Sequence, residues 1–554
     1  MNETIIGSAR IMREYASMHL ADGVRLDADL YFPADCTDLP VLLLRQAYGR
    51  RIASTLCYAH PAWYAAQGYL VVVQDVRGRG TSEGEFTPFE TEAKDGAETI
   101  EWAAALPRAN GRVGMYGFSY QGTNQLQAAS LSPPALKALA PAMIGWDIRR
   151  DWAYEGDAFN LRANLAWSSQ LAAEAARRSG DFTAFGELST PPLAALSSAT
   201  PAGRPPRAEK HLMDTFYGRW LEPENEDGYW SHISPSSALA SLREAALPSL
   251  FIGGWFDSHL PGTVAAYRAL ECSGAARLHI GPWAHFPLDR RIAGEDYGPG
   301  AVSDIDRLQI VWFDAILKNQ EFPDKAKLAP VSLFDLGARD WKYWPQWPDE
   351  RGKALFLVSD GRAAIDMESG RLGAAPGEAC TDMLVHDPWR PAPAIGCGHG
   401  APPGPQNRDL TDNRPDILTY TTAPLGEALE IAGECDALLF LDADQPAFDV
   451  SCTLSRVSPE GNSTCIAAGY LSLLAHDPTA PLTISLRPTC ITLKPAERLR
   501  LSVAAAAYPA YPVNPGTGIP PVEAHRAECR IITLRLRHGG DCPSQLRLTK
   551  GAKE

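Results

Sequence analysis

The stretch that decides the fold is Gly114-Met115-Tyr116-Gly117-Phe118-Ser119-Tyr120-Gln121-Gly122, which has glycines two residues before and three residues after Ser119. Val113 to Tyr116 has the composition of a short buried strand, and Tyr120 to Ala129 has that of a helix. Larger side chains at the two glycine positions would clash where such a strand and helix approach closely. The stretch therefore predicts a strand, a strained turn and a helix, with Ser119 on the turn.

Strands and helices alternate on both sides of this stretch. Val41 to Leu44 and Tyr69 to Gln74 are apolar runs, as expected of strands buried on both faces. Pro61 to Gly68 and Thr91 to Leu106 have the composition and spacing of helices, and Met12 to Phe32 is typical of two antiparallel strands joined by a turn. The alternation predicts an α/β domain with a mostly parallel sheet.

The alternation stops between about Trp146 and Ala240. Leu161 to Arg178 and Glu209 to Trp220 have helical patterns there, which indicate a helical cap inserted into the α/β domain. Strand patterns resume at Ser249 to Gly253 and at Arg277 to Ile280. A helix over Asp304 to Leu317 and a last strand over Pro330 to Leu336 complete this part.

After a segment rich in Trp and Pro, Trp341 to Asp349, which we interpret as a linker, the pattern becomes all-β. Short runs such as Ala354 to Val358, Ser451 to Val457 and Ile531 to Arg537 alternate with turn residues. This predicts a β-sandwich of jelly-roll type. The predicted domains are an α/β domain in residues 1–143 and 241–348, a helical cap in 144–240 and a jelly roll in 349–554.

Composition limits the partners that the chain can have. A formal charge of −15 and a pI near 5.3 over 554 residues argue against nucleic acid and against an anionic membrane surface. The beginning of the sequence has no signal-peptide pattern, and no uncharged apolar run is long enough to span a membrane, so a cytoplasmic protein is expected. The 11 cysteines include no C-x-x-C pair and are expected to be mainly buried thiols rather than disulfides or metal ligands.

Ser119 needs a base and a carboxylate before its hydroxyl can act as a nucleophile. Asp257 ends the run Gly254-Trp255-Phe256-Asp257, and His285 ends Gly281-Pro282-Trp283-Ala284-His285. Each run follows a predicted buried strand, and the chain order Ser, Asp, His is that of α/β-hydrolases. Asp257 could also be a simple turn residue, and His259 and His279 compete with His285 among the 12 histidines.

Taken together, these motifs resemble those of the cocaine-esterase-like acyl hydrolases, which are related to the X-Pro dipeptidyl-peptidase family and the α-amino-acid ester hydrolases. Three motifs carry the resemblance: G-x-S-Y-x-G at Ser119, G-W-F-D at Asp257 and G-P-W-x-H at His285. Further matches span nearly the whole chain: Arg45-Gln46-Ala47-Tyr48, Asp75 to Gly80, Asp95-Gly96, Glu101-Trp102, Asp387-Pro388, Pro391, Pro393, Arg414 to Leu418 and Asp449.

The resemblance implies roles for five of these residues. Ser119 is the implied nucleophile, His285 the general base and acid, and Asp257 the residue that orients His285. The family's oxyanion hole combines a tyrosine hydroxyl with the backbone N–H after the serine, and these correspond to Tyr48 and Tyr120. Both are donors aimed at a developing negative charge, which is the chemistry that an oxyanion requires.

The implied acyl pocket includes Trp152 and Trp167 from the cap, although packing in the core is an alternative role for both. The family also uses the position two residues after the catalytic aspartate, which here is His259. Relatives have an aromatic ring or an acidic residue there, so His259 argues against an amino-ester hydrolase and weakens an aryl-ester assignment. If its imidazole is unperturbed, any selection for polar or anionic acyl groups should strengthen as the pH falls through about 6.5. His259 could instead only position Asp257.

The activity implied is that of a serine hydrolase that cleaves carboxylic esters of small, fairly apolar acids and needs no metal or cofactor. Amide cleavage by an amidase or aminopeptidase of the X-Pro dipeptidyl-peptidase or amino-ester hydrolase type, and acyl transfer, stay open as alternatives. A jelly roll acting as a carbohydrate-binding module is a further reading, which would need an exposed aromatic strip. The expected partner is a small ester or amide substrate, and a homodimer is an open option.

Overall fold

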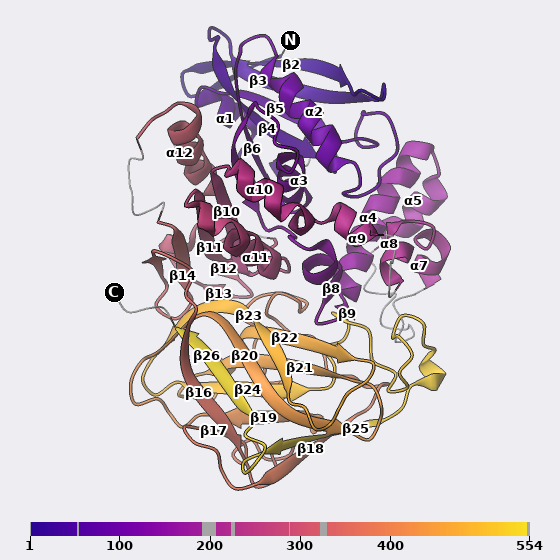
Figure 1. Ribbon diagram of the computed structural model, residues 1–554, viewed down its shortest axis with the longest axis vertical. Coiled ribbons are helices and arrows are strands. Elements are labelled where there is room, and N and C mark those ends of the chain that lie inside the picture. The colour runs from indigo at the N-terminus through magenta and orange to yellow at the C-terminus, as the bar shows by residue number, and fades with distance from the viewer. Residues whose placement is uncertain are drawn as a thin grey trace.

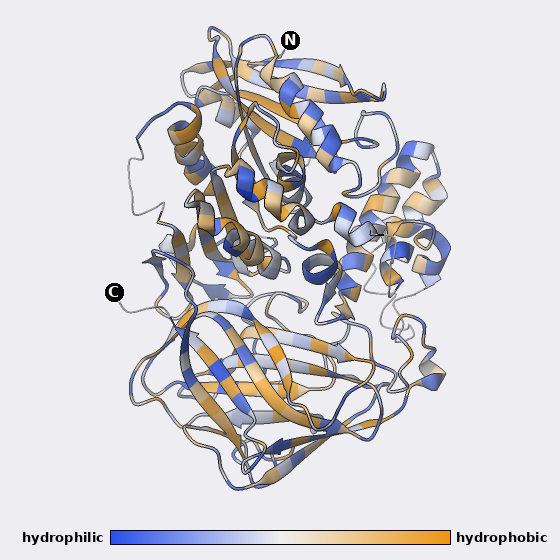
Figure 2. Cartoon of the chain, viewed as in Figure 1, coloured by the Kyte–Doolittle hydropathy of each residue, from blue (hydrophilic) through white to orange (hydrophobic). Residues whose placement is uncertain are grey.

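The computed structural model describes residues 2–51, 55–190, 206–222, 228–286, 288–321 and 329–550. Figure 1 shows three regions: an N-terminal α/β region at the top, a group of helices beside it at the right, and an all-β region below both. Orange apolar segments run along the strands of both sheets in Figure 2, whereas the helices at the right carry mixed colours. The predicted fold class, an α/β domain followed by a separate all-β domain, is confirmed.

The α/β region is built on one long sheet. Neighbouring strands from β5 to β14 are parallel, and antiparallel strands close both edges. Among the described residues, this sheet has 11 strands in the order β1 (Asn2–Ile6), β2 (Ala9–His19), β3 (Arg25–Pro33), β5 (Leu70–Asp75), β4 (Leu39–Gln46), β6 (Ala109–Phe118), β7 (Leu136–Ala142), β10 (Ser249–Phe256), β11 (Ala276–Ala284), β14 (Val331–Asp335) and β15 (Asp340–Trp344).

Strand β4 explains why the central runs are continuously apolar. Successive side chains of a strand point to opposite faces, and Val41 and Leu43 pack into one core cluster while Leu42 and Leu44 pack into another. The first cluster includes residues of α2 (Glu92–Ala104), α3 (Tyr120–Ala129) and α11 (Leu260–Leu270), and the second includes residues of α1 (Pro61–Ala66) and α12 (Ile305–Leu317). The sheet is therefore covered on both faces, as the sequence predicted.

The strand at this edge of the sheet, β15, was not predicted. Residues from Trp341 were interpreted as part of a linker, but β15 pairs antiparallel with β14, and Trp344 lies opposite Val331. The Trp341 ring also stacks on His279, with 4.1 Å between ring centroids. The aromatic residues of this segment therefore complete the sheet edge instead of connecting two domains loosely.

The region between β7 and β10 is mostly helical, as predicted. The predicted helix over Glu209 to Trp220 is two helices in the structure, because Thr215 is extended and its side chain accepts a hydrogen bond from the Tyr217 N–H, which starts a new helix. The elements are a π-helix (Arg149–Ala153), β8 (Tyr154–Glu155), β9 (Ala158–Phe159), α4 (Leu161–Ser179), α5 (Phe182–Ser189), α7 (Pro206–His211), α8 (Phe216–Leu221), α9 (Tyr229–Ile233), a 3-10 helix (Pro235–Ala238) and α10 (Leu239–Ala245).

The C-terminal region is all-β apart from α13 (Asp409–Asp412) and a short 3-10 helix. Its strands form a second sheet, while its jelly-roll topology and the exact domain boundaries stay predictions. The order is β18 (Cys380–His386), β25 (Ile532–His538), β20 (Leu429–Ala443), β26 (Gln545–Lys550), β16 (Glu350–Val358), β17 (Arg371–Gly373), β19 (Ile417–Thr421), β24 (Arg498–Ala504), β21 (Phe448–Val457) and β22 (Ser463–Leu473), with β23 (Leu482–Leu493) paired to β20.

All 11 cysteines are free thiols, and most of those in the C-terminal region are buried, whereas Cys36 and Cys272 are exposed. Within the described residues, no helix is both long enough and apolar enough to cross a bilayer.

Candidate active site

Ser119 lies on the predicted turn between β6 and α3. Its backbone has φ 60° and ψ −125°, a conformation that side-chain-bearing residues rarely adopt. A Cβ at Gly117 would lie 2.6 Å from Gln121 Cβ, and a Cβ at Gly122 would lie 2.4 Å from Ile144 Cγ2. The two glycines are therefore needed for α3 to pack this closely after the strand, and this packing fixes the position of the Ser119 hydroxyl.

The structure brings Ser119, His285 and Asp257 together. Ser119 Oγ lies 3.1 Å from His285 Nε2, and His285 Nδ1 lies 2.7 Å from Asp257 Oδ1. Asp257 follows β10 and His285 follows the neighbouring parallel strand β11, which continues through Gly281 to Ala284. With the Nδ1 proton donated to the carboxylate, Nε2 is the nitrogen that can accept the serine proton.

Asp257 is fully buried. Burial by itself would raise the pKa of its carboxyl group, but the charge and hydrogen bond of His285 outweigh burial and hold that pKa below its usual value. Asp257 is therefore a carboxylate at neutral pH, the form that can orient an imidazole and stabilise its protonated state.

Two hydrogen-bond donors converge on the serine. Burial raises the pKa of Tyr48 to about 12, so its hydroxyl keeps its proton at neutral pH. This hydroxyl interacts with the Ser119 side chain and accepts a hydrogen bond from Trp167 Nε1 at 2.9 Å. The Tyr120 N–H is at the first position of α3, where backbone donors lack a partner within the helix. Tyr48 and Tyr120 are thus both near the nucleophile, as the sequence predicted.

The side chain of Tyr120 is tightly held. Its hydroxyl donates to Glu92 Oε1 at 2.9 Å, and its ring stacks on Phe89 with 4.7 Å between centroids. Glu92 in turn forms a buried ion pair with Arg45. Sequence analysis did not assign a role to Glu92, because the contact joins two segments that no local pattern links.

Trp152, Trp167 and His259 also lie together beside the catalytic candidates. The centroids of the two tryptophan rings are 5.2 Å apart, and the His259 ring is 4.1 Å from Trp152 and 5.1 Å from His285. Trp152 and His259 are 4% and 8% exposed, so both the pocket role and the packing role of Trp152 are compatible with its position.

The expectation that His259 titrates near pH 6.5 is wrong. Burial disfavours the charged imidazole and lowers its pKa to about 3, despite the opposing charge of Asp257. His259 is therefore neutral throughout the physiological range. It offers the site a polar ring edge and no positive charge.

Cavities lie both near and far from this site. A cavity of about 870 Å³ opens between the cap and the loop after β5. Its wall includes Phe86, whose ring is 5.7 Å from that of Tyr120, and Phe216, whose ring is 5.2 Å from that of Trp167. This cavity borders the aromatic layer around Ser119.

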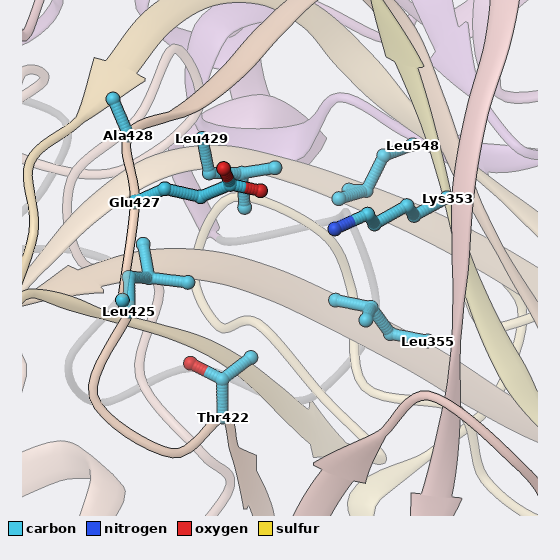
Figure 3. Close-up of a pocket in the computed structure, with 9 residues that line it drawn as sticks. Lys353, Leu355, Thr422, Leu425, Glu427, Ala428, Leu429 and Leu548 are labelled. Carbon is cyan, nitrogen blue, oxygen red and sulfur yellow. The ribbon is translucent and has the colours of Figure 1, made fainter.

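A second cavity, of about 470 Å³, lies in the C-terminal domain. Figure 3 shows Glu427 and Lys353 pointing toward one another across it, with leucines above and below. None of the site residues predicted from the sequence lines it. The described part of the chain contains no group of three or more His, Cys, Asp or Glu residues arranged to hold a metal ion.

Two family models match the chain. The catalytic model of the X-Pro dipeptidyl-peptidase (S15) family matches residues 22–287, which include Ser119, Asp257 and His285. The model of the X-Pro dipeptidyl-peptidase C-terminal non-catalytic domain matches residues 324–547. Both parts of the chain are therefore similar to the corresponding domains of X-Pro dipeptidyl-peptidases. The resemblance that the motifs indicated is confirmed, and with it the assignment of the chain as a serine hydrolase.

Curated relatives match this chain over nearly its full length. A cocaine esterase of Rhodococcus sp. is 28% identical over 95% of this chain and 96% of its own. A putative serine esterase of Mycobacterium bovis is 25% identical over 94% and 95%, respectively. Both names describe esterases, and neither match depends on one domain alone.

Two solved structures share the fold of this chain. An aminopeptidase from a marine-sediment Thaumarchaeota archaeon superposes with a TM-score of 0.80 at 22% identity, covering 97% of this chain and 96% of its own. An α-amino acid ester hydrolase superposes with a TM-score of 0.78 at 20% identity, covering 98% and 97%. Together these neighbours establish the arrangement of an α/β domain with a C-terminal all-β domain.

Proposed function

We propose that the chain hydrolyses carboxylic esters of small, fairly apolar acids through an acyl-enzyme on Ser119. The observation that carries the proposal is the hydrogen-bonded series from Ser119 Oγ through His285 to Asp257, with separations of 3.1 and 2.7 Å. Ser119 lies on a strained turn with two hydrogen-bond donors beside it, the Tyr48 hydroxyl and the Tyr120 N–H. Acyl transfer needs such a nucleophile, base and pair of donors.

In the first step, His285 Nε2 takes the Ser119 proton while Oγ bonds to the ester carbonyl carbon. The carbonyl oxygen becomes an oxyanion, to which the Tyr48 hydroxyl and the Tyr120 N–H donate. The carbon–oxygen bond to the leaving alcohol then breaks, and the alcohol takes the proton from His285. Throughout, the Asp257 carboxylate holds the imidazole in place and stabilises its positive charge.

In the second step, water replaces the alcohol. His285 Nε2 takes a proton from the water as its oxygen bonds to the acyl carbon, and the same two donors stabilise the second oxyanion. The bond to Ser119 Oγ breaks, the acid leaves, and the proton returns from His285 to the serine. The cycle consumes one ester and one water and restores the enzyme.

An ester is preferred over a substrate that carries an ammonium group. The names of the relatives describe esterases, and the aromatic layer of Trp152 and Trp167 suits an apolar acyl group. His259 stands where the amino-ester hydrolases have an acidic residue, and its neutral imidazole provides no negative charge to bind an ammonium group. Amide cleavage, including the aminopeptidase reading, and acyl transfer to a competing alcohol or amine are the second candidates.

The nucleophile is tested by Ser119→Ala. The variant should lose hydrolysis of p-nitrophenyl esters by several orders of magnitude while keeping its thermal unfolding midpoint, because it removes only the attacking atom. A serine-directed phosphonate should label wild-type protein at Ser119 alone. Turnover that survives in Ser119→Ala would contradict the proposed function. Matched esters and amides of graded acyl size, assayed with and without added alcohol, would separate esterase, amidase and acyltransferase activity.

A further inference from the structure

Arg487 reaches from the C-terminal domain to the loop that carries Asp257. Its Nη1 donates to the backbone carbonyl oxygens of Asp257 and Ser258, each at 3.0 Å. Arg487 belongs to β23 and is 6% exposed. We propose that Arg487 is a positioning residue, which holds the Asp257 loop in the place where the carboxylate can orient His285. The proposal rests on the proposed function above.

The guanidinium of Arg487 is itself held from the cap. Its Nε and Nη2 donate to Glu155 Oε1 and Oε2 at 3.2 and 2.5 Å, and the Tyr511 hydroxyl donates to Glu155 Oε2 at 2.6 Å. Burial would raise the pKa of Glu155, but the charge and hydrogen bond of Arg487, together with the other groups around the carboxylate, outweigh burial and keep that pKa below its usual value. A two-point ion pair fixes the plane of a guanidinium, so its remaining nitrogen points at the loop.

The surroundings of this contact leave the loop little freedom. A Cβ on Gly398 of the C-terminal domain would lie 2.5 Å from Arg487 Nη1 and 2.8 Å from the Asp257 carbonyl oxygen. Tyr511 stacks on Tyr470 with 4.0 Å between ring centroids, which fixes the second partner of Glu155. The backbone around Asp257 is therefore enclosed by the C-terminal domain.

The geometry at Asp257 makes catalysis sensitive to this enclosure. Only a short connection separates the end of β10 from the start of α11, so a shift of the carbonyl groups moves the Asp257 side chain with them. The hydrogen bond that depends on it is the 2.7 Å contact with His285 Nδ1. A displacement of about 1 Å in a catalytic group can reduce the rate roughly 100-fold.

Arg268 provides a control for the alternative that Arg487 only strengthens the contact between the C-terminal domain and the rest of the chain. It lies farther along α11 and pairs with Glu434 of β20 at 3.1 Å, so it links the same two parts of the molecule. If Arg487 acts only by holding the domains together, loss of either pair should have similar consequences. If Arg487 positions Asp257, the two losses should differ in kcat.

The test compares wild-type enzyme with Arg268→Gln and with the double variant Glu155→Gln/Arg487→Met. The double variant removes the donors to the loop without leaving a buried carboxylate unpaired, which would otherwise destabilise the fold by itself. On p-nitrophenyl acetate we expect kcat to fall roughly 10- to 100-fold, with KM changed by less than about 2-fold. We expect kcat of Arg268→Gln to stay at the wild-type value.

A spectroscopic readout reports on the same contact without turnover. The far-downfield proton resonance of His285 Nδ1–H depends on its hydrogen bond to Asp257, and it should move or broaden in the double variant and stay in place in Arg268→Gln. A folded double variant with wild-type kcat and an unmoved resonance would overturn the proposal. Equal losses of kcat in the double variant and in Arg268→Gln would overturn it as well.

If the double variant does not fold, Arg487→Lys takes its place. A lysine keeps the charge but cannot bind Glu155 at two points and both carbonyl groups together, so kcat should be intermediate, and wild-type kcat would refute the positioning role. Ser119→Ala is assayed in parallel. Hydrolysis that persists in Ser119→Ala refutes the proposed function itself, which distinguishes the two failures.

Discussion

At the scale of the single residue, Tyr48 offers the most direct test of the oxyanion site. Tyr48→Phe deletes one hydroxyl, and kcat should fall roughly 100-fold or more with a smaller change in KM, because the donor acts mainly on the transition state. The measurement is steady-state hydrolysis of p-nitrophenyl acetate.

The same hydroxyl accepts a hydrogen bond from Trp167, so Trp167→Phe is the matched control. It removes the partner of Tyr48 but keeps the donor that faces the ester. Its kcat on the acetyl ester should stay within a few-fold of wild type. If Tyr48→Phe changes KM alone, Tyr48 binds substrate and does not stabilise the oxyanion.

His259 can be tested as a selector of acyl groups. His259→Phe should shift preference toward benzoyl-type esters and nearly keep kcat on a small acetyl ester, since the ring packs on Trp152. Because its pKa is about 3, the acyl preference of wild-type enzyme should not change between pH 5 and 8. Relative kcat/KM for acetyl and benzoyl esters across that range checks both statements. An equal loss on every acyl group would instead make His259 a support for the Asp257 loop.

Much of the candidate site could be predicted at this scale, because the chain order Ser, Asp, His and the motif around each of these residues are visible in the sequence. Ser119, Asp257 and His285 each end or follow a buried strand, and parallel strands bring such positions to one edge of the sheet. The ionisation of His259 could not be predicted, because it depends on burial by the cap. Arg487 and Glu155 could not be predicted either, since they meet only through the packing of three parts of the fold.

At the scale of the element, the turn at Ser119 depends on the close approach of α3 to β7. A Cβ at Gly122 would lie 2.4 Å from Ile144 Cγ2 and 2.8 Å from the Ala142 carbonyl oxygen. Gly122→Ala should therefore push α3 outward, destabilise the fold by roughly 1–3 kcal/mol and lower kcat. Urea unfolding and esterase assays measure the two effects.

Gly186 in α5 is the matched control, because no atom lies within 4 Å of the Cβ that it would gain. Gly186→Ala should keep kcat and stabilise its helix by up to about 1 kcal/mol. A Gly122→Ala variant that behaves like Gly186→Ala would show that the turn tolerates a looser helix.

Elements were predicted best where the pattern is local and strong. Helix α3 begins and ends at the residues that the sequence indicated, because the strand, turn and helix of the Ser119 stretch each have a distinct composition. The prediction failed where tertiary contacts decide. Thr215 divides a helical pattern into α7 and α8 by capping the second, and β15 forms because β14 offers it an open edge.

At the scale of the whole molecule, buried neutral histidines should make the fold sensitive to acid. Burial lowers the pKa of His259 and His399 to about 3 and that of His386 to about 4. In the unfolded chain these groups take up protons near pH 6.5, so their contribution to stability is complete above pH 6.5. It is lost as the pH falls toward the folded-state pKa. Each of these histidines should lower the free energy of unfolding by about 2 kcal/mol between pH 6.5 and pH 5.

Asp449 acts in the opposite direction. Burial raises its pKa to about 6, so it favours the folded state as the pH falls, and Asp75, Glu92 and Asp151, whose pKa values burial also raises, act in the same direction. The test of the histidines is therefore the slope of the thermal unfolding midpoint against pH between pH 7 and pH 5, compared between variants. His386→Phe should lose less stability toward acid than wild type, because it removes a buried histidine that lies on β18 and is 1% exposed. The exposed His19 is the control, and His19→Asn should leave the slope as it is. A slope unchanged in both variants would contradict the assignment.

The contact between Arg487 and the Asp257 loop also bears on how the enzyme is made. A nascent chain emerges from the ribosome with its N-terminus first, and its domains fold as they emerge. Ser119, Asp257 and His285 are all synthesised before β23. A nascent chain therefore contains its nucleophile and base while the carbonyl groups of the Asp257 loop still lack Arg487 as their donor. If Arg487 acts as proposed, full hydrolytic activity is reached only when the C-terminal domain has emerged and docked. Fragments that end before β23, whether they come from interrupted translation or from proteolysis, would lack this support, so their turnover should be lower than that of the full chain.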